Sequence, residues 1–97
     1  MTELGLIRKK IDQIDDEIIE KISERFRLAF QTLPFKTKTG DRKREALVIS
    51  RARKKASELK FLRPDFVEVL FRLVIRESRR LQNQLDSYDP SLKKESE

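Results

Sequence analysis

The first thirty residues carry an apolar stripe with the period of an α-helix. Its members recur at steps of three and four residues and are Leu4, Ile7, Ile11, Ile14, Ile18 and Ile22. This spacing places the six side chains on one helix face. The stripe predicts a helix from about Glu3 to Leu33, because Pro34 lacks a backbone donor and disfavours helical geometry at the residue before it.

The predicted helix is longer than the domain that one chain can build. About thirty residues span roughly 45 Å at the rise of an α-helix, whereas a compact chain of this size has a diameter of about 32 Å. A chain of 97 residues is also near the lower limit for burying an adequate core alone. The protruding apolar face needs cover, and a second copy of the chain is its simplest source. We therefore expect a homodimer.

Composition narrows both the fold and the chemistry. Charged residues make up 41% and hydrophobic residues 37% of the chain, with two glycines, which is typical of an all-α helical bundle. The absence of cysteine and histidine excludes disulfides, thiolate nucleophiles, the usual zinc ligands and the common near-neutral general base. We expect no metal and no cofactor. The formal net charge of +6 favours anionic partners, among them nucleic acid, anionic lipid and small carboxylates.

The sequence carries no evident targeting or membrane-spanning segment. Its N-terminus lacks an uninterrupted apolar region for export, and no stretch approaches the ~20 apolar residues needed to cross a bilayer. We therefore expect a cytoplasmic protein that has no membrane partner.

The rest of the chain predicts two more helices and a tail. Asp41 sits where an N-cap belongs, directly before a helix over residues 42–60. A third helix over residues 64–87 begins with a proline, which suits the first turn. We predict one helical domain over residues 1–87 and a polar, disordered tail over residues 88–97.

Each predicted helix places polar groups on a face that should be apolar. The groups are Arg25 in the first helix, Arg44 and Glu45 in the second, and Ser78 and Gln82 in the third. Burial without hydrogen bonds costs about 1 to 3 kcal/mol for each neutral group and more for each charge. These side chains therefore either satisfy one another or line a pocket.

Each of these polar side chains, taken alone, also has an explanation that involves no ligand. Arg25 can form an intramolecular ion pair or extend from the edge of its stripe. Asp41 can serve only as a cap. Ser78 and Gln82 can bond to the backbone or to each other, and the charged pair of the second helix can be ordinary surface charge. The coincidence on three helices favours a pocket.

Arg8 extends this argument by geometry. It lies at the edge of the first stripe, seventeen residues before Arg25, or about 25 Å along one helix. No metabolite-sized ligand spans that distance within one chain. If both arginines hold the same small anion, Arg8 must come from a partner protomer.

Spaced motifs on all three helices carry a family resemblance. They are the segment Leu6–Asp15 (LIRKKIDQID), the pair Glu24-Arg25, Lys36, the set Asp41, Arg44 and Glu45, and the third-helix run Phe66–Gln82. Over about residues 4–85 this pattern resembles the all-helical AroQ class of chorismate mutases.

The resemblance implies a three-helix chain in an intertwined homodimer. It further implies an isomerase that converts chorismate to prephenate by a [3,3] pericyclic rearrangement in aromatic amino acid biosynthesis. Such a reaction needs no metal, cofactor, nucleophile or general base. Catalysis would come from holding the reactive conformer and from stabilising the negative charge that develops on the ether oxygen.

The resemblance also assigns roles to residues. Arg25 and the partner's Arg8 would bind the two substrate carboxylates, and Lys36 and Gln82 would donate to the ether oxygen. Glu45 would accept a hydrogen bond from the ring hydroxyl, and Arg44 and Asp41 would orient that end of the substrate. Ser78 would assist in binding a carboxylate.

Two features depart from the family pattern. The loop between Lys36 and Arg44 is shorter than in the bacterial pattern. Pro34 falls just before the lysine, where the family usually continues its first helix. Lys38 is therefore an alternative to Lys36 as the donor from this loop.

Other functions compete with the mutase. Isochorismate pyruvate lyase shares the fold and the class of chemistry, but its pattern has an apolar residue at the position of Glu45. A basic module that binds nucleic acid is suggested by the runs over residues 42–44 and 51–55, although no helix-turn-helix signature accompanies them. A catalytically silent interaction bundle, or a mutase that needs a partner enzyme, is the third alternative.

Overall fold

The computed structural model describes residues 2–35 and 41–88, and side chains as far as residue 84. Its elements in chain order are α1 (Glu3–Gln31), the short 3-10 helix η1 (Leu33–Phe35), α2 (Arg42–Ser57) and α3 (Pro64–Tyr88). No strand occurs in these two ranges. The all-α prediction with one long N-terminal helix is confirmed.

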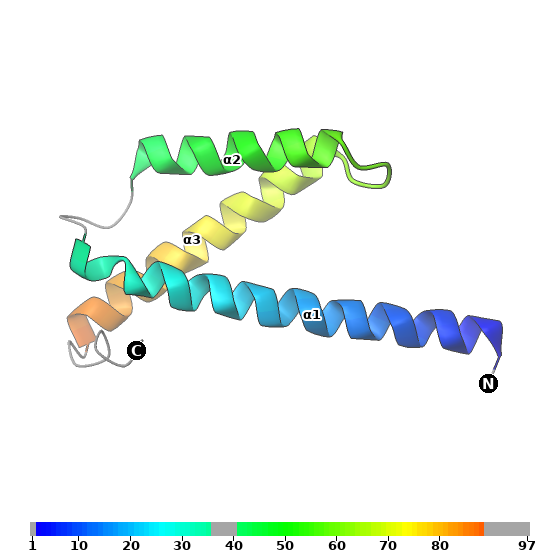
Figure 1. Ribbon diagram of the computed structural model, residues 1–97. Coiled ribbons are helices and arrows are strands. Elements are labelled where there is room, and N and C mark those ends of the chain that lie inside the picture. The colour runs from blue at the N-terminus through cyan, green and yellow to red at the C-terminus, as the bar shows by residue number, and fades with distance from the viewer. Residues whose placement is uncertain (1, 36–40, 89–97) are drawn as a thin grey trace.

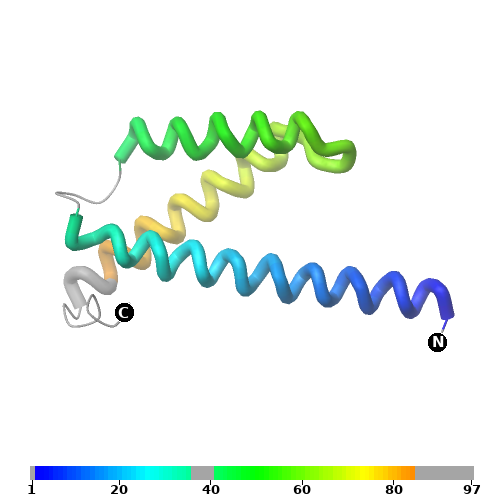
Figure 2. Tube along the Cα trace, in the orientation of Figure 1, coloured from blue at the N-terminus to red at the C-terminus, as the bar shows by residue number. Residues whose placement is uncertain are grey.

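Helix α3 lies against both of the other helices. It runs diagonally from the end of α2 to the C-terminal part of α1 (Figure 1), and it packs against both. The tube in Figure 2 shows the N-terminal part of α1 continuing well past this crossing. All three helices therefore approach one another at one end of the molecule, and the N-terminal part of α1 extends away from it (Figures 1 and 2).

Local hydrogen bonds set the helix ends. The Thr2 hydroxyl accepts from the Gly5 amide at 3.0 Å and caps the start of α1. Helix α1 ends two residues before the predicted Leu33, because the Thr32 hydroxyl donates to the Ala29 carbonyl at 2.6 Å and the chain turns into η1. Similarly, α2 is shorter than predicted, and the Ser57 hydroxyl donates to the Lys54 carbonyl in its last turn.

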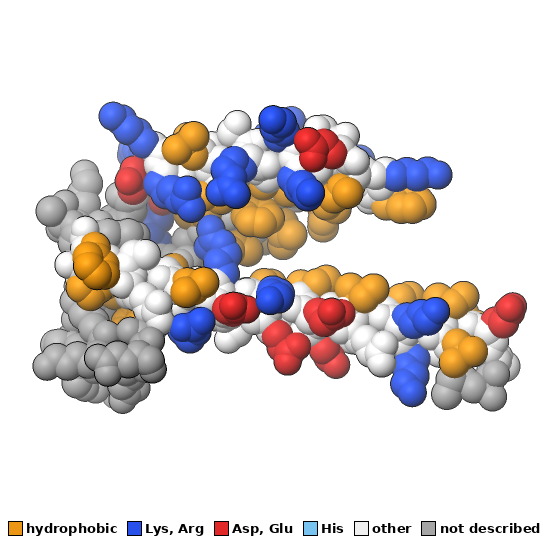
Figure 3. All heavy atoms as spheres, viewed as in Figure 1, with side chains coloured by type: hydrophobic (Ala, Val, Ile, Leu, Met, Phe, Trp, Pro, Cys, Tyr) orange, Lys and Arg blue, Asp and Glu red, His pale blue; other side chains and the backbone are white. Residues whose placement is uncertain are grey.

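The apolar row of α1 is left uncovered within the chain. Five of its members, Leu4, Ile7, Ile11, Ile14 and Ile18, are 50% to 55% exposed. In Figure 3 apolar side chains line the edge of α1 that faces the side of α2. The chain measures 52 × 30 × 18 Å, with a radius of gyration of 16.7 Å, against about 12 to 13 Å for a compact chain of this length. The protruding helix predicted from the sequence is present.

The interior is small and lies mainly between α2 and α3. Its buried hydrophobic residues in the described ranges are Leu33, Ile49, Ala56 and Val67. Ala56 is only 1% exposed, because the small side chain lets the two helices approach closely. Two polar residues of α3, Ser78 and Gln82, are buried as well.

An ion-pair network joins α2 to the start of α3. The Arg53 guanidinium donates to Asp65 at 2.9 Å and to Glu68 at 2.8 Å, and Arg72 donates to Glu68 at 2.7 Å. The hydrogen bond from Arg72, followed by that from Arg53, lowers the pKa of the Glu68 carboxyl below its ordinary value of 4.5 against the opposing effect of desolvation. Glu68 is therefore the shared acceptor of the network.

Replacing Glu68 should reduce the acid sensitivity of the fold. A carboxyl with a lowered pKa in the folded state adds stability above pH 4.5, and this stability is lost as the pH falls through the folded-state pKa. We expect the urea midpoint of Glu68→Gln to fall less than that of the wild type between neutral pH and about pH 3. Glu58→Gln, an exposed change at the C-cap of α2, serves as the control, and an equal acid response in both variants would contradict the assignment.

Candidate functional site

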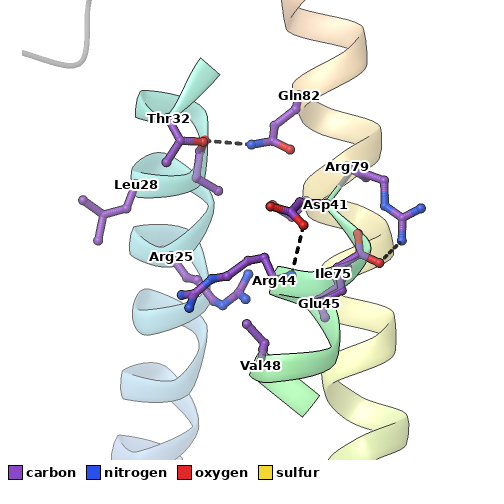
Figure 4. Close-up of a pocket in the computed structure, with 12 residues that line it drawn as sticks. Arg25, Leu28, Thr32, Asp41, Arg44, Glu45, Val48, Ile75, Arg79 and Gln82 are labelled. Carbon is purple, nitrogen blue, oxygen red and sulfur yellow. Dashed lines mark hydrogen bonds and ion pairs between the residues drawn. The ribbon is translucent and has the colours of Figure 1, made fainter. Parts of the chain in front are cut away.

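A hollow of about 370 Å³ lies where the three helices meet. Side chains from α1, α2 and α3 point into it in Figure 4. Six of the eight side chains predicted for the site line it: Arg25, Asp41, Arg44, Glu45, Ser78 and Gln82. The sequence argument that these polar groups share one pocket is therefore supported by their placement.

The other two predicted residues are placed differently. Arg8 is exposed on the protruding part of α1 and does not line the hollow of its own chain. Lys36, and its alternative Lys38, lie outside the described residues. The lining of the described hollow thus comes from the three helices, the C-cap of α1 and the N-cap of α2.

Arg25 is half-buried and faces a second cation. Desolvation by burial, and then the charge of Arg44, lowers the pKa of its guanidinium. Figure 4 shows the two guanidinium groups side by side, Arg25 reaching from α1 and Arg44 from α2. Among residues 2–35 and 41–84 no carboxylate forms an ion pair with either arginine. An anion bound between them would remove the repulsion, so this corner of the hollow is suited to a carboxylate.

Asp41 and Glu45 supply the negative charge of the lining. The Asp41 carboxylate accepts from the Arg44 amide at 3.1 Å and caps α2, which confirms the capping interpretation. Glu45 forms an ion pair with Arg79 of α3, with 3.0 Å between Oε1 and Nη2. Both carboxylates are therefore engaged within the chain, and the uncompensated positive charge comes from Arg25 and Arg44.

Arg79 is a lining residue that the sequence reasoning missed. It precedes Gln82 by three residues, so helical spacing places it on the same side of α3 as this predicted site residue. This spacing was the available signal. Its contact with Glu45 joins α3 to α2 at the edge of the hollow.

Gln82 links α3 to the end of α1. It is 5% exposed, and its side-chain nitrogen donates to the Ala29 carbonyl at 2.7 Å. The same carbonyl accepts from the amide and the hydroxyl of Thr32. The bond to the backbone confirms one of the structural explanations for Gln82, and it also turns the amide nitrogen towards the α1 side of the hollow (Figure 4).

The chemistry available in the hollow is that of binding and positioning. Arginine guanidinium groups, two carboxylates, two hydroxyls and a primary amide line it. Within the described part of the chain no group of three or more histidine, cysteine, aspartate or glutamate side chains could hold a metal ion. No helix among the described residues is long and apolar enough to cross a membrane.

Comparison with known protein families gives a match over most of the chain. The sequence model of a family described as chorismate mutase type II matches residues 7–83, a range that includes every residue lining the hollow. No curated protein and no solved structure shows a significant match to the chain.

Arg25 should cost stability when no ligand is bound. We expect Arg25→Met to raise the free energy of unfolding by about 1 kcal/mol, because it removes a partly desolvated charge that has a cation as its neighbour. Urea unfolding followed by circular dichroism at fixed protein concentration measures the change. Arg27→Met, an exposed position on the same helix, is the matched control. A lower midpoint for Arg25→Met than for this control would show that Arg25 has a stabilising partner within the protein.

Proposed function

Because the chain belongs to the chorismate mutase type II family, we propose that it converts chorismate to prephenate. In this rearrangement the ether C–O bond breaks as a new C–C bond forms within the same molecule. No proton, electron or group is exchanged with the protein. The observation that carries the proposal is the combination of an arginine pair without a carboxylate partner among the described residues with Gln82 and Glu45 in one hollow.

Binding of the substrate carboxylates falls to the arginines. Chorismate carries two carboxylates, and guanidinium groups recognise such groups through two parallel hydrogen bonds. Arg25, supported by Arg44, provides one position in the hollow, where an anion offsets both the desolvation and the repulsion that lower the pKa of Arg25. The buried Ser78 hydroxyl lies on the same lining. The second carboxylate requires a further cation.

Gln82 is placed to assist the reaction itself. A primary amide has two N–H donors, and one of them is used by the Ala29 carbonyl. The other donor is left for the ether oxygen, on which negative charge develops as the C–O bond breaks. Lys36 in the loop before α2 is the second donor that we propose for this oxygen. These interactions strengthen in the transition state and therefore raise the rate.

Glu45 is proposed to accept from the ring hydroxyl. Its Oε1 accepts from Arg79, so the carboxylate is oriented while its other oxygen remains an acceptor. Asp41 and Arg44 border the same end of the hollow. A carboxylate at this position favours the mutase over isochorismate pyruvate lyase, whose pattern has an apolar residue there.

A homodimer would cover α1 and complete the site. A groove of about 710 Å³ along α2 is continuous with the hollow, since Arg25 and Arg44 line both. Its lining also includes the basic residues Arg51, Lys54 and Lys55 and the apolar residues Val48, Ala52 and Phe71. Residues 11–20 of α1 contain five acidic and no basic side chains next to the exposed isoleucines. We propose that the partner's α1 occupies this groove and delivers the partner's Arg8 to the second carboxylate.

The reaction is tested by following purified protein with chorismate and with isochorismate. We expect chorismate absorbance to be lost with formation of prephenate. Arg25→Ala and Gln82→Ala should each lower turnover by about a hundredfold or more while the protein remains helical. Arg27→Ala, on the exposed side of α1, should retain activity. Release of pyruvate and salicylate from isochorismate, without prephenate from chorismate, would favour the lyase, and retention of DNA without either reaction would favour a nucleic-acid-binding module.

The origin of Arg8 is tested by mixing two inactive variants. Arg8→Ala and Arg25→Ala should each be inactive alone. After co-refolding at equal concentration, about a quarter of the wild-type activity should return, because about half of the dimers are mixed and each mixed dimer contains one intact site. Failure to recover activity in dimers shown to be mixed would place Arg8 outside the partner's site.

A further inference from the structure

A second hollow, of about 380 Å³, lies on the other flank of the α2–α3 contact. Four arginines of α3 line it: Arg72, Arg76, Arg79 and Arg80. Glu45 is the one carboxylate-bearing residue of its lining. The volume is within the range of about 300 to 1,000 Å³ that is usual for small-molecule sites.

The arginines of this second hollow have more N–H donors than the carboxylates paired with them can use. Arg72 pairs with Glu68 at 2.7 Å and Arg80 with Glu77 at 2.8 Å. A guanidinium has five N–H donors, so these pairs leave donors on both arginines. Arg76 is exposed and has no ion-pair partner among residues 2–35 and 41–84. The four side chains thus present a cluster of fork-shaped donors around one cavity.

We propose that this second hollow binds a small polyanion bearing phosphate or carboxylate groups. Guanidinium groups recognise both kinds of oxyanion in the same planar, two-pronged geometry. Arg76 would make the first contact, because binding there displaces no intramolecular pair. Arg79 would join it by moving away from Glu45, and the bound anion would replace the carboxylate as the partner of Arg79.

The Glu45–Arg79 ion pair couples this polyanion site to the first hollow. Both residues line both hollows, and in Figure 4 Arg79 reaches around the flank of α3 away from Arg25 and Arg44, with Glu45 turned towards it. A polyanion that draws Arg79 away leaves Glu45 without the donor that orients it. Substrate binding is then weakened, and by linkage substrate weakens polyanion binding to the same extent. This coupling rests on the proposed mutase function, whereas polyanion binding does not.

Titration calorimetry with inorganic pyrophosphate and, separately, citrate at constant ionic strength tests the binding. We expect Arg76→Gln to weaken the binding of both ligands by about tenfold, as the loss of a charged hydrogen bond predicts. Glu45→Gln should strengthen it, because Arg79 is released. Arg63→Gln, which removes the same charge in the connection before α3, should change the affinity by less than about twofold. Binding of one ligand alone identifies which oxyanion chemistry the site takes.

Arg25→Gln identifies which hollow is occupied, since Arg25 lines the first and not the second. Affinity that falls in Arg25→Gln and not in Arg76→Gln would place the anion in the first hollow. An equal loss of affinity in Arg63→Gln and Arg76→Gln would show that the binding depends only on the overall charge of the protein. Either result, or no heat with both ligands, overturns the polyanion site.

The coupling is tested by steady-state kinetics with and without saturating pyrophosphate. The wild type should show a severalfold rise in KM for chorismate with little change in kcat. Arg76→Gln, which does not touch the first hollow, should keep the basal kinetics and lose the response to pyrophosphate. An unchanged wild-type KM at saturation overturns the coupling. If chorismate is not turned over at all, the proposed function fails, and the calorimetric result still decides the polyanion site.

Discussion

The apolar row of α1 is the constraint on which the rest of the structure depends. No residue of α1 is fully buried, and five large aliphatic side chains are half-exposed along it. Burial of an aliphatic side chain contributes about 1.5 to 3 kcal/mol, so covering the exposed half of this row is worth roughly 4 to 7 kcal/mol, comparable to the net stability of a small domain. A helix that leaves so much apolar surface uncovered supports the proposal that a second copy of the chain occupies the groove beside the hollow.

Periodicity predicted the helices because apolar side chains that share one face of a helix recur at steps of three and four residues. The stripe of α1, the proline at the start of α3 and the Asp41 cap of α2 each determine a local structure that tertiary contacts do not alter. The helix ends were less predictable. Thr32 and Ser57 end their helices through hydroxyl bonds to nearby carbonyls, and such bonds compete with the helix without leaving a periodic signal.

Polar residues within apolar rows predicted most of the hollow, since a buried polar side chain needs a hydrogen-bond partner. Of these residues, Ser78 and Gln82 are buried, whereas Asp41 and Arg44 are exposed at its edge. Arg79 escaped this argument because it stands on the flank of α3 among other arginines. Its partner Glu45 lies 34 positions away on another helix. Which flank of α3 faces α2 depends on the crossing of the two helices, and a single sequence does not encode that angle locally. For Arg8 the position on α1 was predictable from the sequence, but its proposed contacts are with a second copy of the chain.

The structural and functional explanations of the polar groups are compatible rather than exclusive. Asp41 caps α2 and also borders the hollow, and Gln82 uses one donor to hold α1 while a second donor remains. Arg25 differs from both, because in the described part of the chain it has a repelling cation beside it and no carboxylate paired with it. Burial of this charge beside another cation is unfavourable, and an anion bound there would offset the cost. A half-buried cation that a bound anion would satisfy is therefore the strongest local indication of a binding site in this chain.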